Sequence, residues 1–197
     1  MPEPRQLVLA STSRYRKELL ERLGLPFESA DPGVNEQAPA AEAPADTAVR
    51  LARLKARAVA HRFPQALLIG ADQVASCDGA VLDKPGTHAN AVRQLTALSG
   101  RTARFDTALA LHDARSGAEQ SRLVSCQVHF RRFGPSQIED YLRREQPYDC
   151  AGSAKSEGLG IALIARIEGE DPTALVGLPL IALTELLAQA GVPVLRG

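Results

Sequence analysis

The chain lacks several features that mark particular classes of protein. It has no Trp and only 4% aromatic residues among its 197, which argues against an aromatic platform for single-stranded nucleic acid. No apolar run approaches the roughly 20 residues that a membrane-spanning helix needs. Neither charge is in excess, since 23 Lys and Arg balance 23 Asp and Glu. These absences predict no nucleic-acid partner and no membrane partner.

Cysteine is also scarce. The three cysteines, Cys77, Cys126 and Cys150, are odd in number and widely spaced, with no C-x-x-C pair, and no histidine lies at zinc-finger spacing. We therefore expect buried or idle thiols and no disulfide framework. The amino end, residues 1–6, lacks the charged head and apolar stretch of a secretory signal. A cytoplasmic protein is the resulting expectation.

Short apolar runs alternate with amphipathic segments along most of the chain. Residues 6–11 are typical of a buried strand, and residues 14–23, capped by Ser13, of a helix that follows it. A second helix is expected after Asp46 as its cap, with Lys55 on its polar face. The remaining expected elements are a strand at 66–72 and helices at 89–98, 135–144 and 179–190.

The middle of the chain has a different pattern. Residues 104–112 and 122–133 are extended runs around a polar turn at 114–118, which predicts a long antiparallel hairpin. A short strand pair is expected around 161–167. Because the hairpin interrupts an alternation of helices and strands, we predict a mixed α/β sheet with two lobes, in a single domain spanning residues 1–197.

The first strand, loop and helix form a place where proteins bind phosphate. Backbone N–H groups at a helix start point at the anion, and residues 11–13 add three hydroxyls. Arg14, Arg16 and Lys17 put cations in the first helical turn, which is unfavourable for an isolated helix. An anionic ligand explains them, and a capped helix with solvated cations is the alternative. The nucleotide motifs G-x-x-x-x-G-K-[ST] and G-x-G-x-x-G are absent there, which excludes a P-loop triphosphatase.

Two acids and two lysines are further candidates for phosphate chemistry. Asp72 ends an apolar run, where open α/β sheets place their ligands, and it could equally be a cap. Glu36 and Asp72 could share a divalent cation with substrate phosphates. Lys55 and Lys84 could be ligands or ordinary solvated lysines. The order of these residues along the chain is stronger evidence for phosphate chemistry than any one of them.

The order of these residues and the short sequence segments around them resemble those of the Maf proteins. Residues 11–20, STSRYRKELL, are similar to the family's opening motif S-x-S-P-x-R-x-x-L-L. The other similar segments are NE at 35–36, RLARLKA at 50–56, GADQV at 70–74, DKP at 83–85, GSAKSEG at 152–158 and LVGLP at 175–179. These blocks occur in order from residue 7 to residue 187, so the resemblance covers nearly the whole chain.

The resemblance implies a nucleoside triphosphate pyrophosphatase. Such enzymes cleave between the α- and β-phosphates of a nucleoside triphosphate, giving the monophosphate and pyrophosphate, with a divalent cation such as Mg²⁺ or Mn²⁺. The implied fold is a two-lobed α/β architecture of the inosine triphosphatase type, with the site in the central cleft. Family members often dimerise, so a homodimer is expected as well.

The resemblance also implies residue roles. Asp72 would be the proton acceptor that activates water, and Glu36 its acidic partner, both of them metal ligands. The implied contacts to the triphosphate and the leaving pyrophosphate are Ser11, Arg16, Lys55 and Lys84. The chain departs from the family pattern at two places: Arg14 stands where Pro is usual, and Asn35 where Asp is frequent.

Three positions divide the family by substrate, and here they are Tyr15, Gln73 and Glu157. An aromatic, Gln and Glu resemble the branch that hydrolyses 7-methylguanosine triphosphate, whereas the dTTP and UTP branch has Arg, Thr and Gln. The chemistry agrees, because N7-methylation makes guanine cationic and a cation is attracted to an aromatic face such as that of Tyr15. The Glu157 carboxylate could accept the guanine N1–H and amine, but would meet repulsion from the carbonyls of uracil.

Two other hypotheses remain open from the sequence. One is a pyrimidine triphosphate pyrophosphatase of the same family, which Gln73 and Glu157 disfavour. The other is a nucleotide-binding regulator of septum formation, which the family's older naming suggests. A binding protein would need the pocket but not a base for catalysis. Retention of Asp72, Glu36 and both lysines therefore favours an enzyme.

Overall fold

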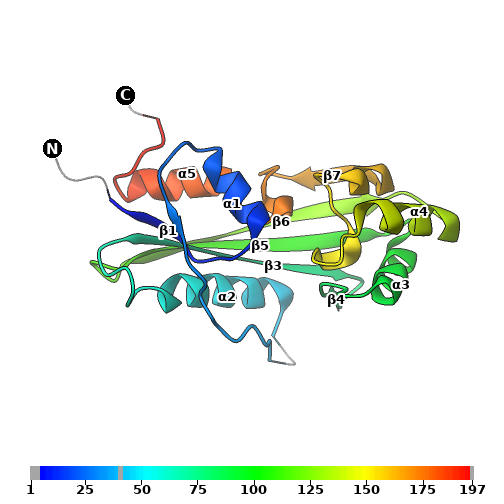
Figure 1. Cartoon of the computed structure of the whole chain (residues 1–197), viewed down its shortest axis with the longest axis horizontal. Helices are drawn as coiled ribbons and strands as arrows, with labels where there is room; N and C mark the ends of the chain where they lie inside the picture. The colour runs from blue at the N-terminus through cyan, green and yellow to red at the C-terminus, as the bar shows by residue number, and fades with distance from the viewer. Residues whose placement is uncertain (1–4, 40–41, 196–197) are drawn as a thin grey trace. The chain divides into compact units, whose positions relative to one another are not determined.

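The computed structural model describes residues 5–39 and 42–195 and contains a seven-stranded mixed sheet (Figure 1). The strands are β1 (Leu7–Leu9), β2 (Glu28–Ser29), β3 (Leu67–Cys77), β4 (Ala80–Leu82), β5 (Thr102–Asp113), β6 (Glu119–Phe130) and β7 (Ile164–Gly169). The strand order is β2-β1-β3-β5-β6-β7, with β4 paired to β3. β1 is parallel to β2 and β3, whereas β4 and β7 pair antiparallel to β3 and β6. The predicted mixed α/β class is confirmed.

Five α-helices and three short 3-10 segments connect these strands. They are α1 (Arg14–Glu21), α2 (Pro44–Ala58), α3 (His88–Leu98), α4 (Pro135–Glu145), α5 (Leu180–Gln189), η1 (Ala151–Ser153), η2 (Leu159–Leu163) and η3 (Ala174–Val176). In the part of the chain described, no helix is both long and apolar enough to span a bilayer. Residues 1–4, on which the absence of a secretory signal partly rested, lie outside the described residues.

The chain divides into two compact units. The first comprises residues 1–73, 107–124 and 171–197, and the second residues 74–106 and 125–170. The long strands β3, β5 and β6 contribute residues to both units. A single domain with two lobes and a central cleft stays a prediction.

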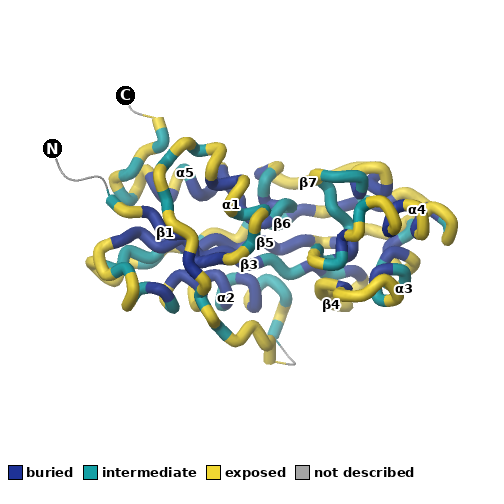
Figure 2. Tube along the Cα trace, in the orientation of Figure 1, coloured by how far each residue is buried: buried dark blue, intermediate teal, exposed yellow. Residues whose placement is uncertain are grey.

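In the first unit, β3 lies between two helical layers. Its side chains alternate between faces, as in any strand. Leu67 and Ile69 join the core formed with α1 and α5, while Gly70 on the other face lies against α2. Figure 1 shows α2 on one face of the sheet and α1 and α5 on the other, and Figure 2 shows the strands between them as buried. Odd-numbered residues of β3 therefore face α1 and α5, and even-numbered residues face α2.

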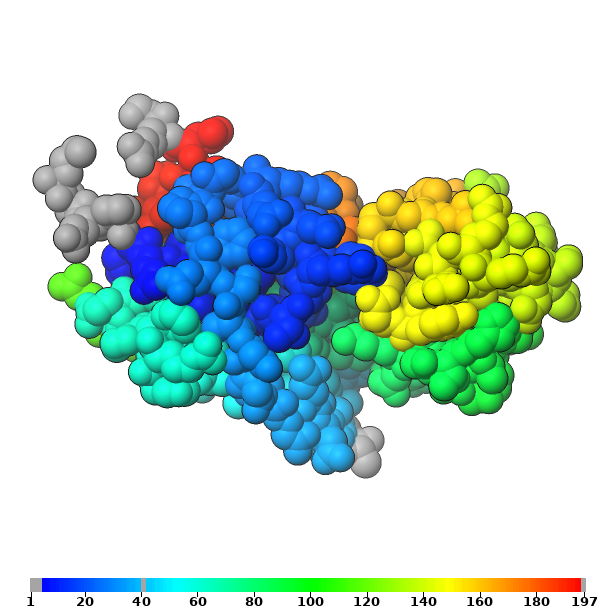
Figure 3. Space-filling model, viewed as in Figure 1, coloured from blue at the N-terminus to red at the C-terminus, as the bar shows by residue number. Residues whose placement is uncertain are grey.

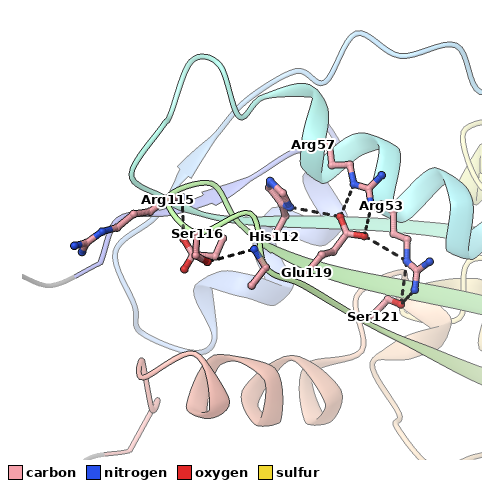
Figure 4. Close-up of polar contacts among 9 residues, drawn as sticks. Arg53, Arg57, His112, Arg115, Ser116, Glu119 and Ser121 are labelled. Atoms are coloured by element: carbon pink, nitrogen blue, oxygen red, sulfur yellow. Dashed lines mark hydrogen bonds and ion pairs between the residues drawn. The ribbon is translucent and has the colours of Figure 1, made fainter.

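A polar cluster holds the outer face of α2 to the β5–β6 hairpin (Figure 4). Arg57 donates to both carboxylate oxygens of Glu119 at 2.7 and 2.8 Å, and Arg53 donates to the hydroxyl of Ser121 at 2.7 Å. The Nδ1 atom of His112 lies 3.5 Å from Glu119. Glu119 thus neutralises the charge of Arg57 on this face of α2, and Ser121 accepts a hydrogen bond from Arg53.

In the second unit, α3 and α4 pack against each other, α3 also contacts η1, and α4 contacts η2. Helix α4 begins after Gly134, with Pro135 in its first turn, and ends at Glu145, followed by Gln146, which has left-handed backbone geometry. The hairpin of β5 and β6 closes near the predicted turn, since Asp113 N donates to Ala118 O at 2.8 Å. The three cysteines are free, as expected.

Three local predictions were wrong. β3 does not end at Asp72 but continues to Cys77, because β4 folds back on it and supplies a partner beyond the short β1. Around residues 161–167 one strand, β7, replaces the predicted pair, and the residues before it form the 3-10 segment η2. Asp46 lies in the first turn of α2 instead of capping it, because Pro44, which has no N–H to satisfy, already begins the helix.

The close approach of β3 to α2 predicts that Gly70→Ala is strongly destabilising. An ideal Cβ at this position would lie 2.1 Å from Ala52 O and 2.7 Å from Ala56 N, both backbone atoms. Chemical denaturation should give a loss of about 2–3 kcal/mol in the free energy of unfolding, because helix and strand must separate. Gly134→Ala is the control, since no atom lies within 4 Å of its Cβ, and should cost about 1 kcal/mol or less. Equal losses in the two variants would contradict the packing argument.

Candidate functional site

The loop after β1 leads directly into the start of α1, as the sequence predicts. Ser11 is buried, and its hydroxyl oxygen accepts the backbone N–H of Ser13 at 3.1 Å. Ser13 in turn caps α1 by accepting the N–H of Arg16 at 3.4 Å. The first turn of α1 contains no acidic residue, so the positive end of the helix dipole meets no carboxylate of its own helix. This geometry suits an anionic ligand.

A buried lysine joins two carboxylates beside this region. Lys55 Nζ lies 2.6 Å from Asp72 Oδ1 and 2.8 Å from Glu36 Oε1. The side chains of Lys55 and Asp72 are only 5% and 8% exposed, whereas Glu36 is 57% exposed and comes from the segment before α2. One ammonium group is therefore the shared partner of an interior acid and a surface acid.

The placement of Lys55 on the polar face of its helix was wrong. Leu51, Ala52, Lys55 and Ala56 are all buried and recur at the spacing of a single helix face. That face packs on β3, on the side where Gly70 and Asp72 project by strand alternation. A lysine is stable there because Asp72 neutralises its charge in the interior.

Arg16 adds a second cation close to these acids. Its Nε donates to the carbonyl of Gly177 at 2.9 Å, which fixes the guanidinium at the turn before α5. Burial lowers the pKa of Arg16, while the carboxylates of Asp72 and Glu36 act in the opposite direction. Gly177 has a φ of 117°, in the left-handed region that favours glycine, and an ideal Cβ there would lie 3.4 Å from Arg16 Nε. The backbone conformation of this turn therefore favours glycine beside the arginine.

Opposing effects act on the pKa of Asp72. Its burial raises the pKa, whereas Lys55 and Arg16 lower it and Glu36 raises it further; the net direction is upward. Ser11, Arg16, Glu36, Lys55 and Asp72 all belong to the first unit, and each of the two acids interacts electrostatically with both cations. The structure thus brings together most of the residues that the sequence singles out for phosphate chemistry.

Gln73 points away from Asp72, because neighbouring residues of a strand face opposite sides. Its amide nitrogen lies 2.9 Å from Thr107 Oγ1 and 3.0 Å from the carbonyls of both Ala174 and Leu175. Thr107 also donates to Ala174 at 2.9 Å. Gln73 therefore holds the η3 turn that precedes Gly177, and its role in base recognition stays a prediction.

Two residues that support this turn, Asp171 and Thr173, were not predicted from the sequence. The carboxylate of Asp171 accepts the N–H of Thr173 at 2.9 Å and that of Ile181 at 2.7 Å. The hydroxyl of Thr173 donates to Asp171 and accepts the N–H of Leu180 at 2.8 Å. Together they satisfy two of the N–H groups at the start of α5, those of Leu180 and Ile181. An Asp-x-Thr pattern before an apolar helix is the signal that could have revealed them.

Tyr15 is half-buried in the first turn of α1, and Arg14 lies over it. The guanidinium carbon of Arg14 is 4.7 Å from the centre of the ring, and its Nη2 donates to the tyrosine hydroxyl at 2.7 Å. The ring is thus already in contact with a cation, the kind of partner that the sequence analysis assigns to it. Arg14, the departure from the family's proline, is accommodated by this contact.

The remaining predicted residues belong to the second unit. Lys84 is exposed in the loop between β4 and α3, and Glu157 is exposed between η1 and η2. The carboxylate of Glu157 accepts a hydrogen bond from Ser156 at 3.3 Å. The predicted roles of Lys84 and Glu157 stay predictions.

The donor set in the first unit is compatible with a hard divalent cation. Asp72 and Glu36 converge on one ammonium group, so both carboxylates reach the same small region. Magnesium is often bound by one or two carboxylates together with waters and substrate phosphates. Among residues 5–39 and 42–195, no group of three or more His, Cys, Asp and Glu residues is placed to hold a metal by itself. A cation here would depend on phosphate oxygens for the rest of its coordination.

Taken together, the molecule is a mixed α/β protein in which a buried acid, a buried lysine and a half-buried arginine gather beside a helix N-terminus that follows the first strand. A model of the Maf-like protein family matches residues 6–190 of this sequence. The chain belongs to the Maf-like protein family.

Similar proteins match over nearly the full length. A protein of Methylobacillus flagellatus named 7-methyl-GTP pyrophosphatase is 56% identical over 189 residues, covering 96% of this chain and 98% of the relative. Proteins of the same name from a Polaromonas species and from Albidiferax ferrireducens are 57% and 53% identical, covering 97% and 99% of this chain and 87% and 99% of the relatives. Among solved structures, the Ham1 protein of Staphylococcus aureus has a TM-score of 0.46 at 14% identity, covering 64% of this chain and 72% of that chain.

The buried pair predicts that Lys55→Met is strongly destabilising. Removal of the ammonium leaves the interior carboxylate of Asp72 without its charge partner, at a cost of about 3 kcal/mol. Adding Asp72→Asn should restore part of that stability, and urea denaturation of the two single variants and the double variant measures the coupling. Arg57→Ala, which breaks an ion pair whose arginine is 60% exposed, should cost about 1 kcal/mol or less. Strictly additive losses for Lys55 and Asp72 would refute the coupling.

Proposed function

We propose that this chain is a nucleoside triphosphate pyrophosphatase that hydrolyses 7-methyl-GTP to 7-methyl-GMP and pyrophosphate. The observation that carries the chemistry is the buried Asp72, held by Lys55 close to Arg16. The substrate is supported by relatives of 53–57% identity that bear the name 7-methyl-GTP pyrophosphatase. In this proposal the enzyme removes a modified nucleotide before it can enter RNA.

Binding of the triphosphate is assigned to the loop after β1. The N–H groups at the start of α1 and the hydroxyl of Ser11 are suited to phosphate oxygens, and the guanidinium of Arg16 adds charge. Arg16 is fixed by Gly177, so little conformational freedom is lost when an anion binds. Lys84 is the further cation that the family resemblance assigns to the leaving pyrophosphate.

Hydrolysis is an attack of water on the α-phosphorus. Asp72 accepts the proton of the attacking water, the bond from the α-phosphorus to the bridging oxygen breaks, and pyrophosphate leaves with that oxygen. Lys55 keeps the carboxylate in one orientation, and with Arg16 it stabilises negative charge on the phosphates. Mg²⁺ or Mn²⁺, when held by Asp72 and Glu36, supplies additional neutralisation of phosphate charge.

Recognition of the base is assigned to Tyr15 and Glu157. The face of Tyr15 favours a cationic base, as its contact with Arg14 illustrates. The carboxylate of Glu157 can accept both donors on the guanine edge, while uracil offers one N–H between two carbonyls. Gln73 would contribute through the η3 turn that its amide holds.

The proposal extends to the state of the protein in the cell. It includes a cytoplasmic location, where nucleotide pools for RNA synthesis reside, a single domain containing both units, and a homodimer. None of these is needed for the chemistry of Asp72. Gel filtration with light scattering would test the dimer, with a monomer at micromolar concentration contradicting it.

A nucleotide panel tests the proposed activity. With Mg²⁺ or Mn²⁺ present, 7-methyl-GTP should be hydrolysed with a kcat/KM at least about tenfold above those for UTP and dTTP, and pyrophosphate should be released in place of phosphate. Chelation of the metal should abolish turnover, and its return should restore it. A preference for UTP and dTTP would overturn the substrate assignment, and no hydrolysis of any nucleotide would favour a binding protein.

Asp72→Asn tests the catalytic base. The variant keeps the size of the side chain but cannot accept the proton of water, so kcat should fall by about 10²–10⁴-fold. Equilibrium binding of 7-methyl-GTP, measured by calorimetry, should persist. Asp113→Asn, which changes a carboxylate that pairs with Arg5 at 2.5 Å, is the control and should retain activity. Unchanged hydrolysis in Asp72→Asn would refute the assignment.

A further inference from the structure

The last residue of α4, Glu145, binds both ends of the loop that carries Glu157. Its carboxylate accepts Lys155 Nζ at 2.8 Å and the backbone N–H of Leu159 at 2.6 Å. The side chain of Glu145 is only 13% exposed. Burial raises the pKa of Glu145, but the hydrogen bonds from Lys155 and Leu159 outweigh it and lower the pKa. The carboxylate is therefore charged at neutral pH and holds Glu157 between its two partners.

The glycine next to Glu157 leaves space for the same carboxylate. An ideal Cβ on Gly158 would lie 2.8 Å from both Oε1 and Oε2 of Glu145. The φ of Gly158 is −123°, outside the left-handed region, and the limited space beside the carboxylate favours glycine here. Gly160 is confined as well, since its Cβ would lie 2.5 Å from Lys155 O. The loop is built closely around the end of α4.

Helix α4 holds the loop at one further point. The hydroxyl of Tyr141, one turn before Glu145, accepts the backbone N–H of Lys155 at 3.1 Å. Tyr141 is itself buried, which fixes its hydroxyl. In Figure 3 the segment around residues 148–160 forms part of the outer surface of the second unit, and Glu157 within it is exposed. The backbone beside this exposed carboxylate is thus positioned from the interior.

A glutamate at this position is unfavourable for the helix alone. The carboxyl end of a helix carries partial negative charge, which repels an acid in the last turn. Arg143 and Arg144 in the same turn follow the usual preference, and Glu145 departs from it. Its contacts with Lys155 and Leu159 compensate for that repulsion. A residue that costs the helix stability but organises a functional loop is typical of a positioning role.

We propose that Glu145 is a positioning residue for base recognition, which holds Glu157 in the geometry that accepts the guanine edge. This inference rests on the proposed function and extends it to a residue outside the motifs that identify the family. Glu145 acts through the loop backbone and does not touch the nucleotide. Its removal should therefore affect the KM for a guanine nucleotide much more than kcat.

Two variants disturb the contact in different ways. Glu145→Gln removes the charge and places an amide N–H₂ against donors, while Gly158→Ala leaves the carboxylate but pushes it aside. In both, the KM for 7-methyl-GTP should rise about tenfold while kcat changes less than about threefold, so that the preference over UTP falls about tenfold. Amide hydrogen exchange of residues 155–160 should become faster. Asp140→Asn, a 58% exposed carboxylate on the same helix, is the matched control and should change none of these.

The outcomes separate this inference from the proposed function. An unchanged preference for 7-methyl-GTP in both variants overturns the inference, as does an equal fall of kcat for every nucleotide at constant KM. If Glu145→Gln does not fold, as judged by circular dichroism, Gly158→Ala decides. If the wild type does not hydrolyse 7-methyl-GTP, the proposed function fails and the base-recognition role fails with it. Hydrogen exchange then shows separately whether Glu145 orders the loop.

Discussion

The pairing of one buried ammonium with one buried carboxylate is the constraint on which the first unit depends. Lys55 and Asp72 are each costly to bury alone, and at 2.6 Å they neutralise each other. Their contact requires that one face of α2 lie on the even-numbered face of β3, with Gly70 allowing the close approach. The packing of α2 on β3 therefore determines where these charged groups lie.

A second principle is that the candidate functional side chains are held by backbone groups and helix caps. Arg16 is fixed by the carbonyl of Gly177, and the turn containing Gly177 is fixed by Gln73 and by Asp171. In the second unit, Glu145 plays the corresponding part for the loop of Glu157. Rigid support of this kind limits the entropy lost on binding and keeps charges in orientations that a flexible surface could not maintain.

The contacts of Tyr15 and Gln73 refine the account of base recognition. Tyr15 carries an arginine over its ring, so a cationic base would meet a residue already in cation–π contact. Gln73 donates to a turn on the opposite side of β3 from Asp72. Of the three positions that the sequence predicts to determine the substrate, Gln73 therefore supports the backbone of the η3 turn, and its substitution would alter the position of Arg16.

Much of the molecule followed from local sequence alone: the helices, the hairpin, the capped start of α1 and membership of the Maf-like family. These depend on periodicity, capping and motif order, which are properties of neighbouring residues. Only the tertiary structure decided that Lys55 is buried, that β3 continues past Asp72 and that Gln73 faces the η3 turn. Those outcomes depend on partners distant in the chain, such as Asp72, β4 and Thr107, whose proximity no local pattern contains. Helical periodicity alone predicts a solvated Lys55, because the acid that neutralises it, Asp72, belongs to another element.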